Sequence, residues 1–113
     1  MSLSSHVLDA AIGRPAPDLS LSLEREQDGD WKRIGGGVTD DDGRWRHRND
    51  TGDAELDAGV YRLAFSTGDY FRASGQTGFY PEVVVTFEIT DPASHHHVPL
   101  LLSPYAYSTY RGS

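Results

Sequence analysis

The chain has 113 residues, and its 17 acidic and 10 basic side chains give a net charge of −7. This length favours one domain spanning residues 1–113, and the acidic balance argues against a nucleic-acid partner, because phosphates bind clustered Lys and Arg. The absence of cysteine excludes disulfides and thiolate zinc sites and is compatible with the cytoplasmic location that we expect. We expect no membrane association, because no apolar run approaches the roughly 20 residues that span a bilayer. We expect no secretory signal, because "MSLSSHVLDA" lacks a basic region followed by an apolar one.

Most of the chain alternates between apolar and polar residues, which is typical of half-buried strands. Leu19, Leu21 and Leu23, for example, alternate with polar residues. Turn signals such as "QDGD" and "TDPAS" separate the segments. Short strands at this spacing predict an all-β antiparallel sandwich. The expected strands, in chain order, are 3–9, 18–26, 31–39, 44–48, 59–66, 83–90, 96–102 and 105–111.

Two segments depart from the alternation. In 68–78, Tyr70, Phe71 and Ala73 show no period of two, which predicts a short helix between strands. The glycine triplet 35–37 lies between strand-like residues and has no helix after it, so it predicts a loop or bulge and not a phosphate cradle.

The first strand contains an outward histidine. If Ser5 and Val7 face inward, His6 and Leu8 face outward together. An outward Leu beside an outward His is unusual on a solvated face and fits a surface that another subunit covers. The alternative is a lone surface histidine.

Arg44 follows the acidic turn "DDDG" at the start of a short strand, and Arg46 and Arg48 share its face by alternation. A guanidinium pairs well with planar anions and amide-like acceptors, which makes Arg44 a candidate ligand-binding residue. The alternative is a surface arginine that balances the neighbouring aspartates.

Three consecutive histidines begin the strand at 96–102. If Val98 and Leu100 point into the core, His95 and His97 point outward and His96 inward or into the preceding turn. Two histidines on one strand face can share a metal or a proton. The alternative is a polar start to the strand with exposed imidazoles.

The terminal strand, 105–111, has apolar or aromatic residues on both of its faces. Such a strand is often buried at an interface. Edge-to-edge pairing in a closed symmetric oligomer would also protect it from aggregation.

Four segments together resemble a known family. They are "SSHVLDAAIGRPA", "TDDDGRW", "YRLAFSTGDYF" and "HHHVPLLLSPYAYSTYRGS", and they cover nearly the whole chain in the family's order. The chain resembles the transthyretin-like proteins and, within them, the 5-hydroxyisourate hydrolases. The ending "YRGS" distinguishes the hydrolases from the hormone-carrying transthyretins. In one departure, His96 stands between His95 and His97 where the family frequently has Tyr.

The resemblance implies a transthyretin-like (prealbumin-like) sandwich of two four-stranded sheets with one short helix over 69–76. It implies a homotetramer, built as a dimer of dimers with active sites in the groove between the dimers. It implies no cofactor. The implied reaction is the hydrolysis of 5-hydroxyisourate to 2-oxo-4-hydroxy-4-carboxy-5-ureidoimidazoline in urate degradation, a part of purine metabolism.

The resemblance also implies roles for particular residues. His6, Arg44 and His97 would be catalytic: the two histidines would activate water and deliver a proton, and the guanidinium would bind the ring and stabilise negative charge. Which histidine is the base stays open. A zinc site formed by His6, His95 and His97 is a weaker alternative. The expected substrate-binding residues are His6, Arg44, Tyr110, Arg111, Gly112 and Ser113.

A different class of function is a carrier that binds a small hydrophobic ligand in a central channel. Tyr110 and His6 argue against it, because a bulky tyrosine and an imidazole would narrow such a channel and make it polar.

Overall fold

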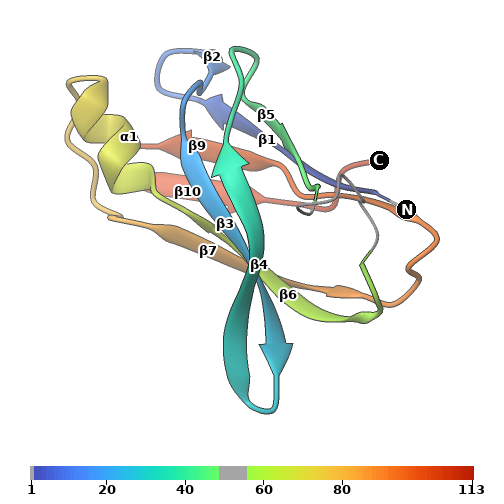
Figure 1. Ribbon diagram of the computed structural model, residues 1–113. Coiled ribbons are helices and arrows are strands. Elements are labelled where there is room, and N and C mark those ends of the chain that lie inside the picture. The colour runs from blue at the N-terminus through green and yellow to red at the C-terminus, as the bar shows by residue number, and fades with distance from the viewer. Residues whose placement is uncertain (1, 49–55) are drawn as a thin grey trace.

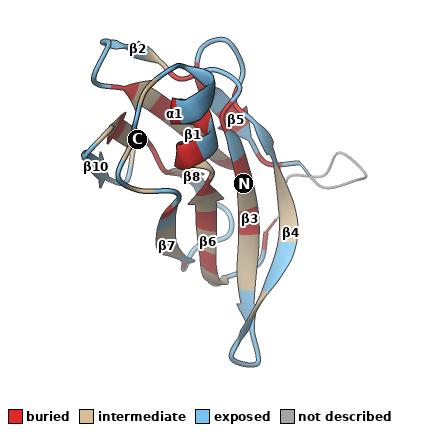
Figure 2. Ribbon diagram, turned by 90° about the vertical axis from the view of Figure 1, so that its left-hand side faces the viewer, coloured by how far each residue is buried: buried red, intermediate tan, exposed pale blue. Residues whose placement is uncertain are grey.

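The computed structural model describes residues 2–48 and 56–113. Two β-sheets face each other, and one short helix lies at one end of the sandwich, with both termini toward the other end (Figure 1). The buried residues gather between the sheets and beneath the helix (Figure 2). The all-β sandwich predicted from the alternation is confirmed. Among the described residues, no helix is long and apolar enough to cross a membrane.

The four-stranded sheet is antiparallel throughout. Its order is β4 (Asp30–Val38), β3 (Ser20–Gln27), β6 (Gly59–Phe65) and β7 (Val83–Ile89). The inward residues of β3 and β6 are leucines and aromatics, and the register between the strands shifts at a bulge between Leu23 and Glu24, opposite the glycine-rich part of β4. The glycine triplet therefore belongs to a bulged strand pair, as predicted.

The second sheet is organised around β1 (Ser2–Asp9). One edge of β1 pairs in the antiparallel sense with β5 (Arg44–Arg46) and β2 (Arg14–Pro15). The other edge pairs in the parallel sense with β8 (His95–His97) and β9 (Leu100–Ser103), and β10 (Ala106–Thr109) pairs with β9. The sheet therefore has four strand positions, of which two are filled by two segments each.

The prediction of one strand over 96–102 is wrong in one respect, because the structure has two strands there. β8 ends at His97 and β9 begins at Leu100, with Val98 and Pro99 between them. Proline has no N–H to donate to a ladder, so the pairing is interrupted there and resumes on the same neighbour, β1. The two-residue strand β2 was not expected either.

Helix α1 (Thr67–Ala73) begins two residues before the expected 69–76 and ends three residues earlier. The Thr67 hydroxyl donates to the Tyr80 carbonyl over 2.8 Å and anchors the start of the helix. Tyr70 and Phe71 are buried against the core.

A buried carboxylate ties this helix to the central strand. Asp9, fully buried at the end of β1, accepts hydrogen bonds from the Tyr70 hydroxyl (2.7 Å), the Ala11 amide (3.0 Å) and the Gln76 side chain (3.3 Å). Burial, together with the bond to Asp9, raises the pKa of Tyr70 well above its ordinary value. The residues that follow β1 are therefore held by a polar contact inside the core.

Replacing Asp9 by Ala should leave the Tyr70 hydroxyl and the Ala11 amide buried without an acceptor. We expect the free energy of unfolding to fall by about 2–4 kcal/mol, measured by urea denaturation. Asp57→Ala is the control, because the Asp57 side chain is 92% exposed and its ion pair with Arg25, among the described residues, is long at 3.7 Å. An Asp9→Ala protein as stable as the control would show that the carboxylate does not hold this region.

Candidate active site

The outward face of β1 carries the first candidate residue. The side chains of β1 alternate strictly: Leu3, Ser5, Val7 and Asp9 are buried, whereas Ser2, Ser4, His6 and Leu8 are partly exposed. The predicted outward position of His6 and Leu8 is confirmed.

The register of β1 brings candidates from three strands onto this face. His6 lies directly opposite Arg44 of β5, and Ser4 lies opposite Arg46 on one side and His97 of β8 on the other. Because directly opposed residues of paired strands point to the same face, the structure gathers His6, Arg44 and His97. These three residues are separated by up to 91 positions in the chain.

A polar pocket opens at this point, which we call the outer-face pocket. It is lined by Ser4, Ser5, Asp40, Arg44, Trp45, Arg46 and His97. Its arginines form no ion pair with any residue in the described parts of the chain. Two guanidiniums and an imidazole on one face favour an anionic or carbonyl-rich ligand. Ser4, Asp40 and Arg46 were not assigned to the site from the sequence, although Ser4 shares the alternation of His6.

The turn before β5 fixes the position of Arg44. One Asp40 carboxylate oxygen accepts hydrogen bonds from the backbone amides of Asp42 and Arg44, each over 2.9 Å. Gly43 has φ +74°, and a Cβ there would lie 2.4 Å from the Val7 carbonyl oxygen. A residue with a side chain would therefore be strained and would push this turn off β1. The acidic "DDDG" segment is thus a structural turn that delivers Arg44 to the face.

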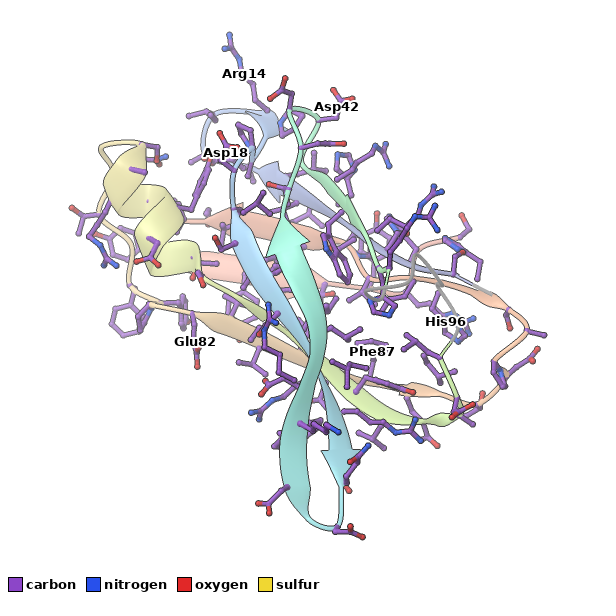
Figure 3. All side chains as sticks on the ribbon, viewed as in Figure 1. Arg14, Asp18, Asp42, Glu82, Phe87 and His96 are labelled. Carbon is purple, nitrogen blue, oxygen red and sulfur yellow. The ribbon has the colours of Figure 1, made fainter. Side chains whose placement is uncertain are left out.

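His6 is oriented by the same turn. Its Nε2 lies 2.8 Å from the Asp42 carbonyl oxygen. A carbonyl only accepts, so Nε2 carries the hydrogen and Nδ1 is left for other contacts. Figure 3 shows Asp42 in this turn, near Arg14 of β2.

His97 is partly buried, and its Nδ1 lies 2.8 Å from the Ser4 hydroxyl. Burial lowers the pKa of His97, and the positive charges of His95, Arg44 and His6 lower it further. The His95 and His97 rings are nearly parallel, at 16°, with centroids 6.2 Å apart. His97 is therefore neutral at pH 7 and able to accept a proton.

The segment after β10 is held against His97. The Gly112 amide donates to the His97 carbonyl over 2.9 Å, and the two residues form an isolated antiparallel bridge. A Cβ on residue 112 would lie only 2.4 Å from His97 Cδ2, so only glycine allows this approach. This close contact explains why a glycine suits this position of "YRGS".

Tyr110 and Arg111 lie on another side of His97. They line a second, largely apolar cavity, the edge pocket, together with residues that include Val85, Phe87 and Val98. His97 lines both pockets. Phe87 and His96, which also line the edge pocket, lie near each other in Figure 3. Within one chain, the structure does not bring Tyr110 and Arg111 into the outer-face pocket.

Three further expectations concern His96, the terminal strand β10 and a metal site. His96 is buried, with its Nδ1 3.1 Å from the Ser94 carbonyl, as the alternation predicted. All four residues of β10 are exposed in the single chain, so any burial of its faces needs a partner. Among the described residues, no group of three or more His, Cys, Asp or Glu side chains is placed to hold a metal. The zinc alternative of His6, His95 and His97 stays a prediction.

The family comparisons agree with this geometry. The model of the HIUase/Transthyretin family matches residues 3–112. The chain belongs to this family. A Salmonella dublin protein named 5-hydroxyisourate hydrolase is 45% identical over 98% of this chain and 80% of its own length.

Solved structures support the same assignment of the fold. Klebsiella pneumoniae 5-hydroxyisourate hydrolase has a TM-score of 0.86 and 35% identity over 100% of both chains. Sea bream transthyretin, in complex with thyroxine, has the same score and identity over 97% of this chain and 93% of its own. The predicted family and fold are confirmed. Because a hydrolase and a transthyretin are equally similar in fold, the backbone alone does not separate these functions.

The electrostatics of His97 can be tested by NMR titration. The His97 imidazole should titrate below its ordinary pKa of 6.5. Replacing His95 by Gln removes a positive neighbour, which stabilises protonated His97 and moves the midpoint upward. The control is Arg14→Gln at the other end of β1, which should leave the midpoint unchanged. A wild-type midpoint at or above 6.5, or no response to His95→Gln, would contradict this description.

Proposed function

We propose that this protein is an enzyme that hydrolyses 5-hydroxyisourate to 2-oxo-4-hydroxy-4-carboxy-5-ureidoimidazoline, a step in urate degradation. The observation that carries the proposal is the register of β1, which aligns His6 with Arg44 and Ser4 with His97 on one face. The name of the 45% identical Salmonella dublin relative supports the same reaction. A cytoplasmic location is part of the proposal.

The reaction needs three things from the protein. A water oxygen attacks a ring carbonyl carbon, the carbon–nitrogen bond breaks, and a proton reaches the departing nitrogen while a carboxylate forms. The protein must therefore activate water, stabilise the developing oxyanion and deliver a proton. A pocket with two guanidiniums and nearby imidazoles contains groups for each task.

His97 is the base in this proposal. Its Nδ1 is occupied by the Ser4 hydroxyl, whereas its Nε2 has no hydrogen bond to any residue in 2–48 or 56–113. The lowered pKa of His97 keeps the ring neutral, so Nε2 can take a proton from water. General base assistance of this kind contributes about 10²–10⁴-fold to a rate.

Arg44 and His6 act on the other side of the substrate. Arg44 makes no ion pair with the described residues, so its guanidinium is available for the ring carbonyl and the oxyanion. His6 lies directly opposite Arg44, and with Nε2 donating to the Asp42 carbonyl its Nδ1 is left to exchange a proton. Delivery of a proton from Nδ1 to the departing nitrogen requires the doubly protonated imidazole, which the hydrogen of the carboxylic acid product can restore. Arg46 adds a second positive charge for the carboxylate product.

The C-terminal residues form another wall of the proposed site. Gly112 packs against His97, and Tyr110 and Arg111 line the adjoining edge pocket. We propose that they border a groove that is completed when subunits assemble as a dimer of dimers, with Ser113 at its rim. The exposed side chains of β10 and the edge position of β7 are surfaces that such an assembly would cover.

The carrier alternative fits the site less well. The sea bream transthyretin structure holds thyroxine in a very similar fold. In this chain, however, the outer-face pocket is lined mainly by polar and charged side chains, including Arg44, Arg46 and Asp40. A small hydrophobic ligand would leave these groups without partners, which costs binding free energy.

The central residues can be tested by substitution. His97→Asn, His6→Asn and Arg44→Gln should each lower kcat for freshly prepared 5-hydroxyisourate by about 10²-fold or more, because each removes a group used in the transition state. The assay follows the loss of substrate absorbance. Thermal unfolding and native mass spectrometry check that the variants keep their fold and assembly.

Arg48→Gln is the matched control for Arg44→Gln. Arg48 is an exposed arginine that continues the alternation of β5, but it does not line the outer-face pocket. It should retain the wild-type rate. The site assignment fails if folded His97, His6 and Arg44 variants keep near-native rates, or if Arg48→Gln is impaired as severely as Arg44→Gln.

A further inference from the structure

Ser4 occupies a central position in the candidate site. It lies on β1 between Arg46 and His97, lines the outer-face pocket and places its hydroxyl 2.8 Å from His97 Nδ1. The same hydroxyl lies 3.5 Å from His95 Nε2. Ser4 is therefore the side chain that contacts the inner ring nitrogen of the proposed base.

We propose that Ser4 is a positioning residue that selects the tautomer of His97, with the hydrogen on Nδ1 and the lone pair of Nε2 turned toward the pocket. This inference rests on the proposed role of His97 as the base. Ser4 itself does not react with the substrate.

The charges around His97 make such a selection necessary. The basic groups around His97 are His95 on its own strand, His6 on β1, Arg44 and Arg46 on β5 and Arg111 in the terminal segment. The acidic groups that line its two pockets are Asp40 in the turn and Glu88 on β7. This surrounding, with burial, keeps the ring neutral. A neutral imidazole has two tautomers, of which only one can accept a proton at Nε2.

The contacts of the Ser4 hydroxyl allow it to accept a hydrogen bond from the His97 ring. A hydroxyl can accept one hydrogen bond and donate another, and its second neighbour is His95 Nε2 at 3.5 Å, which accepts when the His95 hydrogen is on Nδ1. Ser4 can thus accept from His97 Nδ1 and turn its own hydrogen toward His95.

Gly112 holds the opposite edge of the ring. Its approach to Cδ2 leaves no room for a Cβ, whereas Ser4 contacts Nδ1. The two flipped orientations of an imidazole have almost the same shape, so packing by Gly112 alone does not distinguish them. The Ser4 hydroxyl does, since a flip would replace Nδ1 by carbon and break the hydrogen bond.

The first test reads the tautomer directly. In wild-type protein at about pH 8, where the imidazole is neutral, nitrogen NMR should show His97 with hydrogen on Nδ1. Ser4→Ala should shift the population toward the Nε2–H form, and Ser4→Thr, which keeps a hydroxyl on a strand, should restore the wild-type signals. Ser2→Ala is the matched control, because Ser2 lies on the same face of β1 but bonds to His95.

The second test reads catalysis in the same variants. Ser4→Ala should lower kcat by about 10- to 100-fold with a much smaller change in KM, because substrate still binds while the base is misdirected. Ser4→Thr should recover most of kcat, and Ser2→Ala should lose little. A residue that only stabilised the fold would lower the amount of active protein without moving the tautomer signals.

Several results would overturn the inference. These are an unchanged His97 tautomer in Ser4→Ala, a shifted tautomer with unchanged kcat, no recovery in Ser4→Thr, or a covalent substrate adduct on Ser4. A failure of the proposed function can be told apart from a failure of the inference about Ser4, because the NMR result does not depend on the substrate. A wild-type protein that shows the tautomer response but does not hydrolyse 5-hydroxyisourate would refute the function alone and leave Ser4 as the residue that positions His97.

Discussion

The pairing of β1 along both of its edges is the constraint on which the site depends. One edge holds β5 and β2, and the other holds β8 and β9. A slip of one residue would turn Leu3 and Val7 into solvent and His6 into the core, so the burial of these apolar side chains fixes the register. The hydrophobic effect on the inner face therefore aligns the polar groups on the outer face.

The outer-face pocket also shows how local charge can oppose the charge of the whole chain. The protein carries a net charge of −7, yet Arg44, Arg46 and His97 meet at one pocket. The acidic turn before β5 uses its Asp40 carboxylate to bind backbone amides, so that carboxylate serves the turn. Such a pocket attracts an electron-rich or anionic ligand at short range. The fold is shared with a thyroxine-bound transthyretin, so function depends on the side chains that the fold presents and not on the fold alone.

Much of the fold and part of the candidate site could be predicted from the sequence. The rest depends on contacts between residues that are far apart in the chain. Alternation correctly predicted the inward and outward sides of β1 and the inward position of His96, because the two faces of a strand differ in solvation. It could not predict that β8 and β9 are separate, since both halves pair with β1 and only Pro99 signals the break. The bond between Ser4 and His97 joins residues 93 positions apart, so no local pattern reveals it.

The central claim is that His6, Arg44 and His97 form one binding site on the outer face. The most direct measurement is a crystal structure of the protein with urate, the planar purine from which the substrate is formed. We expect urate in the outer-face pocket, with its carbonyl edge on the Arg44 guanidinium and a water or ring atom within hydrogen-bond distance of His97 Nε2. Urate bound instead in the edge pocket against Val85 and Phe87, with no contact to Arg44, would contradict it.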